Sequence, residues 1–158
     1  MSILDRTDRA ILSALQEDGR LSVTDLAERV NLSHTPCLRR VKRLEAQGII
    51  RGYAAMVDQQ AVGLPVSVFV SVTLERQAEA ELDQFEAAIR ACPEVMECFL
   101  MTGGSDFLLR VVAADLQAYE LFLKRALTRI PGIRAIQSSF ALKQVVGRAA
   151  LPLANHDQ

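Results

Sequence analysis

Apolar residues in the first part of the chain recur at the three-to-four-residue spacing of amphipathic helices. A first helix is predicted over residues 5–16, and Gly19 is suited to end it. Its two faces are predicted to separate apolar Ile3, Ala10, Ile11, Ala14 and Leu15 from polar Asp8, Arg9, Ser13 and Glu17. A second, short helix is predicted to follow the N-cap residue Ser22 and to close at Asn31.

A third helix is predicted to begin at Ser33, another suitable N-cap residue, and to end at Gly48. Pro36 fits its first turn, because amide hydrogens there have no intrahelical partner. At about 100° per residue, the apolar side holds Cys37, Val41 and Leu44, and the opposite side holds Thr35, Arg39, Lys42 and Arg43. The short connection through Leu32 forces helices two and three into a sharp crossing, which predicts a helix-turn-helix.

The second half of the chain repeats one plan of strand and helix. Apolar and polar residues alternate from Val66 to Leu74, as in a strand with one buried face. Further strands are predicted from Val95 to Leu100, from Phe107 to Val112 and from Ile133 to Leu142, with helices over residues 78–92 and 115–129. The resulting order βαββαβ is typical of a ferredoxin-like split βαβ fold, so the chain is predicted to be α+β.

Four segments follow from these patterns. They are a helix-turn-helix domain over residues 1–52, a strand linker over 53–65, a ferredoxin-like domain over 66–145 and an extended tail over 146–158. The linker strand is predicted to run from Ile49 to Val57. Both helices of the second domain are expected to cover one face of the sheet, which leaves Phe69 and Phe99 on the other. Such an uncovered face needs a partner, and a two-fold copy of the chain is the commonest one.

Charge is divided unevenly between the two halves. The chain has 18 basic and 19 acidic residues, a formal net charge of −1. Residues 1–52 carry nine bases and seven acids, a net of +2, and the remaining 106 residues carry nine bases and twelve acids, a net of −3. Residues 33–51 alone hold five bases and one acid. A near-neutral total therefore does not argue against a nucleic-acid partner.

The third helix is the candidate DNA-binding element. In a helix-turn-helix the second helix of the pair enters the major groove with its N-terminal end leading. Near base edges we therefore expect Ser33, His34, Thr35 and Pro36, and near phosphates or the groove we expect Arg39, Arg40, Lys42 and Arg43. The alternative is that the four bases form only a solvated surface. The short turn, the cap and the core face opposite the bases together favour DNA.

Other classes of function find little support in the sequence. Cys37, Cys92 and Cys98 form no CxxC pair, and neither His34 nor His156 lies at metal-ligand spacing from them, so no zinc site or other cofactor is expected. No nucleophile, base and orienting group stand out together, so the chain is not expected to be an enzyme. No apolar run is long enough to span a membrane, and early charges interrupt any leader, which predicts a cytoplasmic, nucleoid-associated protein.

Several segments, taken in order, resemble one family of prokaryotic transcription factors. The segments are residues 4–12, 32–45 and 48–53, then Gly103 to Val111, and finally Pro131-Gly132. Together they are similar to the leucine-responsive/asparagine-regulator family, Lrp/AsnC, over about residues 4–145. The resemblance implies a DNA-binding head, a strand linker and a βαββαβ effector domain whose dimers assemble into larger rings. It also implies that amino acids bind at interfaces between effector domains.

The resemblance also implies which residues respond to the effector. They are Leu100, Thr102, Gly103, Asp106, Leu116, Ser138, Ser139, Phe140 and Ala141, and Gly104 is added through its backbone amide. Asp106 is expected to accept from an α-ammonium group, and the amides of the two glycines to receive a carboxylate. Gly104 and Ser105 stand where family members often have an acidic residue and an aromatic one. The alternative for this loop is a tight hairpin in which Asp106 caps a turn.

The function predicted from these features is sequence-specific transcriptional regulation controlled by an amino-acid effector. The expected partners are double-stranded DNA, an amino acid and further copies of the chain, as a homodimer assembling to an octamer. The alternative is a metabolite-binding assembly protein without specific DNA regulation. Deleting residues 1–52 discriminates the two, because only the regulator loses its function.

Overall fold

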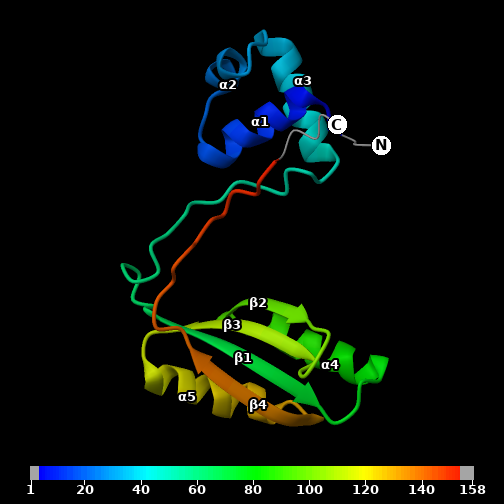
Figure 1. Cartoon of the computed structure of the whole chain (residues 1–158), viewed down its shortest axis with the longest axis vertical. Coiled ribbons are helices and arrows are strands. Elements are labelled where there is room, and N and C mark those ends of the chain that lie inside the picture. The colour runs from blue at the N-terminus through cyan, green and yellow to red at the C-terminus, as the bar shows by residue number, and fades with distance from the viewer. Residues whose placement is uncertain (1–3, 154–158) are drawn as a thin grey trace. The chain divides into compact units, whose positions relative to one another are not determined.

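A computed structural model describes residues 4–153, and the chain divides into two compact units. Residues up to Met56, together with those from Val145 onward, form the head, and Val57–Gln144 form the body. The head contains helices α1 (Arg6–Glu17), α2 (Val23–Arg29) and α3 (His34–Ala46) (Figure 1). The body contains β1 (Val66–Leu74), α4 (Glu79–Arg90), β2 (Val95–Leu100), β3 (Phe107–Ala113), α5 (Leu116–Arg125), the 3₁₀ turn η1 (Leu127–Arg129) and β4 (Ile133–Phe140).

Local capping accounts for where the helices of the head begin and end. Asp5 caps α1 in a reciprocal capping box with Asp8, and the Ser22 hydroxyl accepts from the amide of Asp25 at the start of α2. Asn31 takes φ 54°, and Gly48 takes φ 68° just after α3, so both stop signals are confirmed. Ser33 occupies the N-cap position of α3, but its hydroxyl makes no capping hydrogen bond within the described chain.

The three helices of the head enclose one small core. The fully buried members include Ile11, Leu26, Cys37 and Leu44. The predicted faces of the first helix were wrong at two positions, because Asp8 is buried at 1% exposure whereas Ala10 is exposed. Ile3, which was placed on the apolar face, lies outside the described residues.

The C-terminal segment belongs to the head. The amide of Leu151 donates to Gln16 Oε1 at 2.6 Å, and Gln16 Nε2 donates back to the Leu151 carbonyl at 3.2 Å. Leu153 packs half-buried against the helical core. Residues that the sequence predicted only as an extended tail therefore contribute contacts to the three-helix unit.

The predicted linker strand is not formed. Residues 51–58 have no strand assignment, although the backbone continues out of α3 after Gly48. An isolated extended segment leaves its N–H and C=O groups without a ladder partner, and the described part of this single chain supplies none. This segment contacts α3 through a side chain, because the Tyr53 hydroxyl donates to Glu45 at 2.9 Å.

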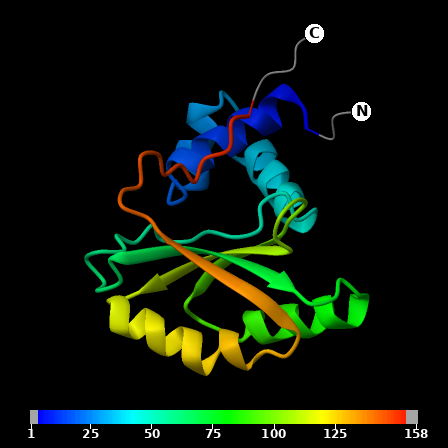
Figure 2. The ribbon, with the colours of Figure 1, turned by 60° about the horizontal axis from the view of Figure 1, so that its bottom comes forward.

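The body has the predicted ferredoxin-like arrangement. Its four strands are antiparallel in the order β2-β3-β1-β4, and α4 and α5 cover one face of the sheet (Figure 2). Val68, Val70 and Val72 are fully buried on that face, as their alternation predicted. The intervening Phe69 lies on the other face at 40% exposure, as does Phe99 on β2 at 54%. One sheet face is thus a packed core, and the other is an open mixture of aromatic and polar groups.

Within residues 4–153, no helix has the length and apolar character needed to cross a bilayer.

Candidate DNA-binding and ligand-binding sites

The turn between α2 and α3 presents the start of α3 to solvent. The amide of Leu32 donates to the Ala27 carbonyl at 2.8 Å, which closes α2. Ser33, His34 and Thr35 are exposed, and Pro36 is half-buried in the first turn. The opposite side of α3 is anchored by buried Cys37, Val41 and Leu44. The side chains predicted to approach base edges are therefore presented together by a helix that is fixed from behind.

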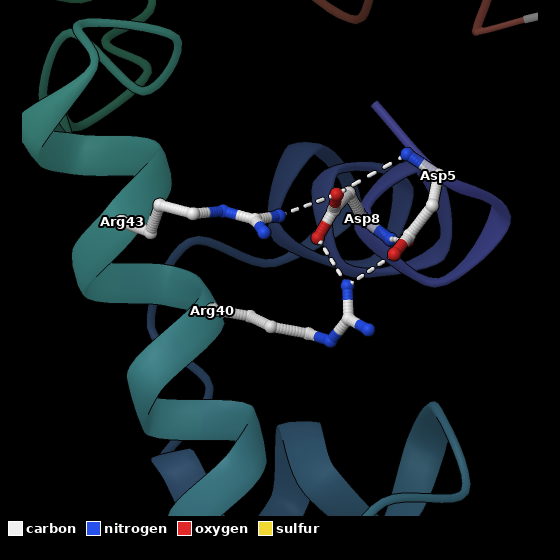
Figure 3. A network of polar contacts seen from close by, with 4 residues as sticks. All are labelled: Asp5, Asp8, Arg40 and Arg43. Atoms are coloured by element: carbon white, nitrogen blue, oxygen red, sulfur yellow. Dashed lines mark hydrogen bonds and ion pairs between the residues drawn. The ribbon is translucent and has the colours of Figure 1, made fainter. Parts of the chain in front are cut away.

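The four predicted phosphate-contacting bases separate into two pairs. Arg39 and Lys42 are exposed, and within residues 4–153 the ion pairs of α3 are made by Arg40 and Arg43 alone. These two guanidinium groups point toward α1 and meet the carboxylate of Asp8 (Figure 3). Two of the four basic side chains of α3 are thus already paired with carboxylates of the head, which the sequence pattern did not show.

The Asp8 carboxylate has a partner on each oxygen. Arg40 donates to Oδ1 at 2.8 Å and Arg43 donates to Oδ2 at 2.5 Å, while the Asp5 amide donates to Oδ2 at 3.2 Å. Arg40 also donates to Asp5 Oδ2 at 2.6 Å. The hydrogen bond from Arg40 lowers the pKa of Asp5, and the hydrogen bonds to Asp5 and Asp8 raise the pKa of Arg40. Because Asp8 is buried, its carboxylate depends on these partners, so the network also holds α1 against α3.

Sequence reasoning missed the role of Asp8 for a physical reason. The spacing of Asp5 and Asp8 was a usable signal for a capping box, which accounts for their first-turn position. The burial of Asp8, however, depends on two arginines that lie 32 and 35 residues further along the chain. A helical projection of α1 alone assigns every carboxylate to solvent.

In the body, Asp106 is engaged by the chain itself. Its side chain is 5% exposed and accepts from the Leu74 amide at 2.7 Å and from Gln77 Nε2 at 2.6 Å. Its own amide donates to the Val72 carbonyl at 2.9 Å. Gly103 takes φ 120° in the loop between β2 and β3. The carboxylate of Asp106 thus ties the start of β3 to the end of β1, and the alternative in which it caps a turn stays a prediction.

The other expected effector residues form two separate groups within one chain. Leu100, Thr102, Gly103, Gly104 and Asp106 lie on and after β2, whereas Leu116 begins α5 and Ser138, Ser139 and Phe140 end β4. β2 and β4 are the opposite edges of the four-stranded sheet, which separates them by about 14 Å. The loop residue Gly104, however, shares a hollow on the open face with Ala135 and Gln137 of β4.

The β4 group packs onto α5. Tyr119 and Ser138 share a hydrogen bond of 2.5 Å between their hydroxyls, and the Phe140 ring meets Tyr119 edge-on with centroids 5.4 Å apart. Ser139 pairs with Phe69 and so lies on the open face. Structure therefore brings Ser138 and Phe140 together and directs Ser139 away from them.

Two shallow hollows flank the sheet. One, of about 240 Å³, is lined by Glu86, Ile89, Arg90, Cys98, Leu100 and Phe107. The other, of about 330 Å³, lies on the open face and is lined by Ser71, Thr73, Gly104, Ser105, Ala135 and Gln137. Burial and the charge of Glu86 raise the pKa of the Cys98 thiol, which makes it a weak nucleophile. Among the described residues, no group of His, Cys, Asp and Glu side chains is arranged to hold a metal ion.

A basic helix-turn-helix joined to a ferredoxin-like domain defines a DNA-binding regulator with a separate ligand domain. Residues 4–51 match the winged helix-turn-helix DNA-binding family, and residues 67–151 match the Lrp/AsnC ligand binding domain. The chain belongs to the Lrp/AsnC family of transcriptional regulators, as its resemblance predicted.

Similar proteins align with at least 90% of this chain. The Bkd operon transcriptional regulator of Pseudomonas aeruginosa is 54% identical over 153 residues, covering 97% of this chain and 100% of that protein. The leucine-responsive regulatory protein of Escherichia coli is 42% identical over 142 residues, covering 90% and 87%. The crystal structure of a transcriptional regulator from Neisseria meningitidis in complex with L-methionine has a TM-score of 0.90, with 44% identity and coverage of 97% and 98%.

Proposed function

We propose that α3 reads DNA in the major groove through Ser33, His34 and Thr35, with Pro36 shaping the leading turn and Arg39 and Lys42 meeting phosphates. The observation that carries this proposal is the grouping of exposed polar and cationic side chains opposite the buried face of α3. Hydroxyl and imidazole groups discriminate base edges, whereas the cations add attraction that does not depend on sequence. Arg40 and Arg43 lie on the flank of α3 that contacts Asp8 of α1.

Gel-shift titration at stated salt tests this assignment. Arg39→Ala is expected to weaken binding to every DNA fragment alike, and each lost phosphate contact flattens the salt slope by about 0.9. Thr35→Ala or His34→Ala is expected to change the preference among sequences, with a smaller effect on the salt slope. Glu28→Ala, on the exposed surface of α2, is the matched control. If Arg39→Ala binds all fragments as the parent does, α3 does not lie against the phosphates.

We further propose that the effector is an amino acid and that its site is shared between two copies of the chain. Support comes from the two edges of the sheet, because Leu100 ends β2 at one edge whereas Ser138 and Phe140 lie on β4 at the other. Thr102, Gly103 and Gly104 from one copy supply a loop, and Leu116 with Ser138 and Phe140 from another supplies the facing wall. The methionine complex of the similar Neisseria regulator indicates the class of ligand.

Thermal-shift screening of the twenty amino acids, followed by light scattering with each hit, tests the effector proposal. A ligand that binds between copies raises the melting temperature and changes the mass distribution together. Thr102→Val and Leu116→Ala are both expected to reduce the shift, although they lie on different elements. If no amino acid alters either reading, the effector assignment fails while the DNA assignment stands.

We propose that the open sheet face carrying Phe69 and Phe99 forms a homodimer and that dimers assemble to an octamer.

We also propose that the regulator acts in the cytoplasm on the nucleoid, and that it works by binding alone, without catalysis or cofactor. A metabolite-binding protein without specific DNA regulation keeps its function after removal of residues 1–52, and that outcome contradicts the regulator.

A further inference from the structure

The contact between α1 and α3 arranges three charged side chains in a fixed pattern. Arg40 and Arg43 lie one turn apart on the same flank of α3, and each donates to a different oxygen of Asp8. Figure 3 shows both side chains extending from α3 toward α1 and converging on that carboxylate. Two anchor points on one helix fix both its rotation and its position along its axis. Asp8 thus adds two polar anchors to a helix whose buried face is already held by Cys37, Val41 and Leu44.

Exposure differs among the members of this network. Asp8 has a side-chain exposure of 1%, whereas the side chains of Arg40 and Arg43 are 27% and 44% exposed. Arg43 is therefore engaged by a buried carboxylate while its side chain remains partly exposed. A DNA phosphate that approaches α3 competes with Asp8 for the guanidinium of Arg43. If the phosphate binds Arg43, the buried carboxylate keeps only Arg40 as a cationic partner.

The network lowers the net positive charge of the surface that is proposed to face DNA. Arg40 and Arg43 are matched by the carboxylates of Asp5 and Asp8, so these four side chains sum to zero. The exposed cations of α3 outside the network are Arg39 and Lys42. Each phosphate contact adds about 0.9 to the salt slope and strengthens binding to any sequence. A head that withholds two of four cations binds non-specific DNA less tightly.

We propose that Asp8 is a positioning residue for DNA recognition, which holds Arg40 and Arg43 away from the phosphates and limits sequence-independent affinity. This inference rests on the proposed placement of α3 in the major groove. Discrimination between target and other DNA then comes from the residues at the start of α3, because the cationic contribution common to all sequences is kept small.

Salt titrations of binding to a non-specific duplex test the inference with a matched pair of variants. Arg39→Ala is expected to lower the slope by about 0.9 per head, whereas Arg43→Ala is expected to leave it unchanged. Asp8→Asn frees Arg43 and is expected to raise the slope by about 0.9 per head, and Asp8→Asn/Arg43→Ala is expected to return it to the parent value. A purely structural role of Asp8 does not produce this cycle.

Each outcome has a distinct meaning. Equal flattening by Arg43→Ala and Arg39→Ala overturns the role of Asp8, because Arg43 then contacts phosphates in the parent protein. An unchanged slope in both of these variants and in Lys42→Ala contradicts the placement of α3 instead. If Asp8→Asn does not fold, the comparison of Arg39→Ala with Arg43→Ala decides the question, since Arg40 still pairs with Asp8 in both.

Discussion

Asp106 shows how a single buried carboxylate connects two elements of the body. Asp106 lies just before β3. Its carboxylate accepts hydrogen bonds from the Leu74 amide at the end of β1 and from the Gln77 side chain that follows β1. Both donors lose their acceptor when the carboxylate is removed. A buried donor without a partner costs about 1–3 kcal/mol, so Asp106 is a structural residue whatever its part in effector binding.

Asp106→Ala is therefore expected to lower the free energy of unfolding of the body by about 2–3 kcal/mol. Urea unfolding monitored by circular dichroism provides the measurement. Asp83→Ala, at an exposed position of α4, serves as the control and is expected to change stability by less than about 0.5 kcal/mol. Equal stability of the two variants contradicts the structural role of the carboxylate.

Tyr53 introduces a pH dependence into the head. Burial, followed by its hydrogen bond to Glu45, raises the pKa of its phenol to about 12 from an ordinary value of 10.0. Folding thus favours the protonated phenol, and this contribution to stability is complete below pH 10.0 and is lost as pH rises toward 12.

Absorbance titration of the phenolate is expected to show this raised pKa for Tyr53 and to lose that component in Tyr53→Phe. Burial also raises the pKa of Tyr119, so the difference between parent and variant isolates Tyr53. Tyr53→Phe is further expected to remove the alkaline loss of stability of the head. A Tyr53 component that titrates at the ordinary value in the folded protein contradicts the hydrogen bond of its hydroxyl to Glu45.

At the scale of single elements, the sequence predicted those features that depend only on neighbouring residues. Ser22, Asn31 and Gly48 marked the ends of helices, and alternation from Val66 predicted the buried side of β1. The linker strand predicted from Ile49 to Val57 is not formed, because a strand needs a ladder partner. The burial of Asp8 also escaped prediction, since its partners come from α3.

The C-terminal segment is an element that the sequence did not assign. Its anchor combines the paired hydrogen bonds between Gln16 and the Leu151 backbone with the half-buried side chain of Leu153. It returns to a unit whose helices come from the opposite end of the chain. The head is consequently joined to the body by two stretches of backbone rather than one.

Leu153→Ala is expected to destabilise the head by about 1 kcal/mol through lost apolar burial. Leu151→Ala is the matched control, because its side chain is 70% exposed and its hydrogen bonds come from the backbone. Hydrogen exchange of the α1 amides measures both effects. Equal protection in the two variants contradicts the packing of Leu153 on the head.

At the scale of the whole molecule, the formal charge of −1 is the sum of two unlike halves. The head has a net charge of +2 over residues 1–52, and its network of Asp5, Asp8, Arg40 and Arg43 is internally neutral. We expect such a head to bind DNA weakly by itself, so that two or more heads joined by the proposed assembly raise the effective concentration at the operator. Assembly through the body is then expected to strengthen DNA binding.

Phe69→Asp is expected to reduce the mass of the assembly, because it places a charge on the open sheet face. Light scattering coupled to size exclusion provides the measurement. Leu121→Asp, at a 61% exposed apolar position of α5, is the control and is expected to keep the parent mass. Loss of mass in the control alone indicates that copies meet through the helices instead.

Footprinting of the full chain on DNA that includes its own promoter tests the central claim most directly. The account predicts discrete protected half-sites separated by about one helical turn, or a multiple of it, at physiological salt. Thr35→Ala is expected to lose or shift this pattern while retaining binding to DNA in general. Uniform protection without sequence preference, by the parent protein on every fragment, contradicts the claim that this chain is a sequence-specific regulator.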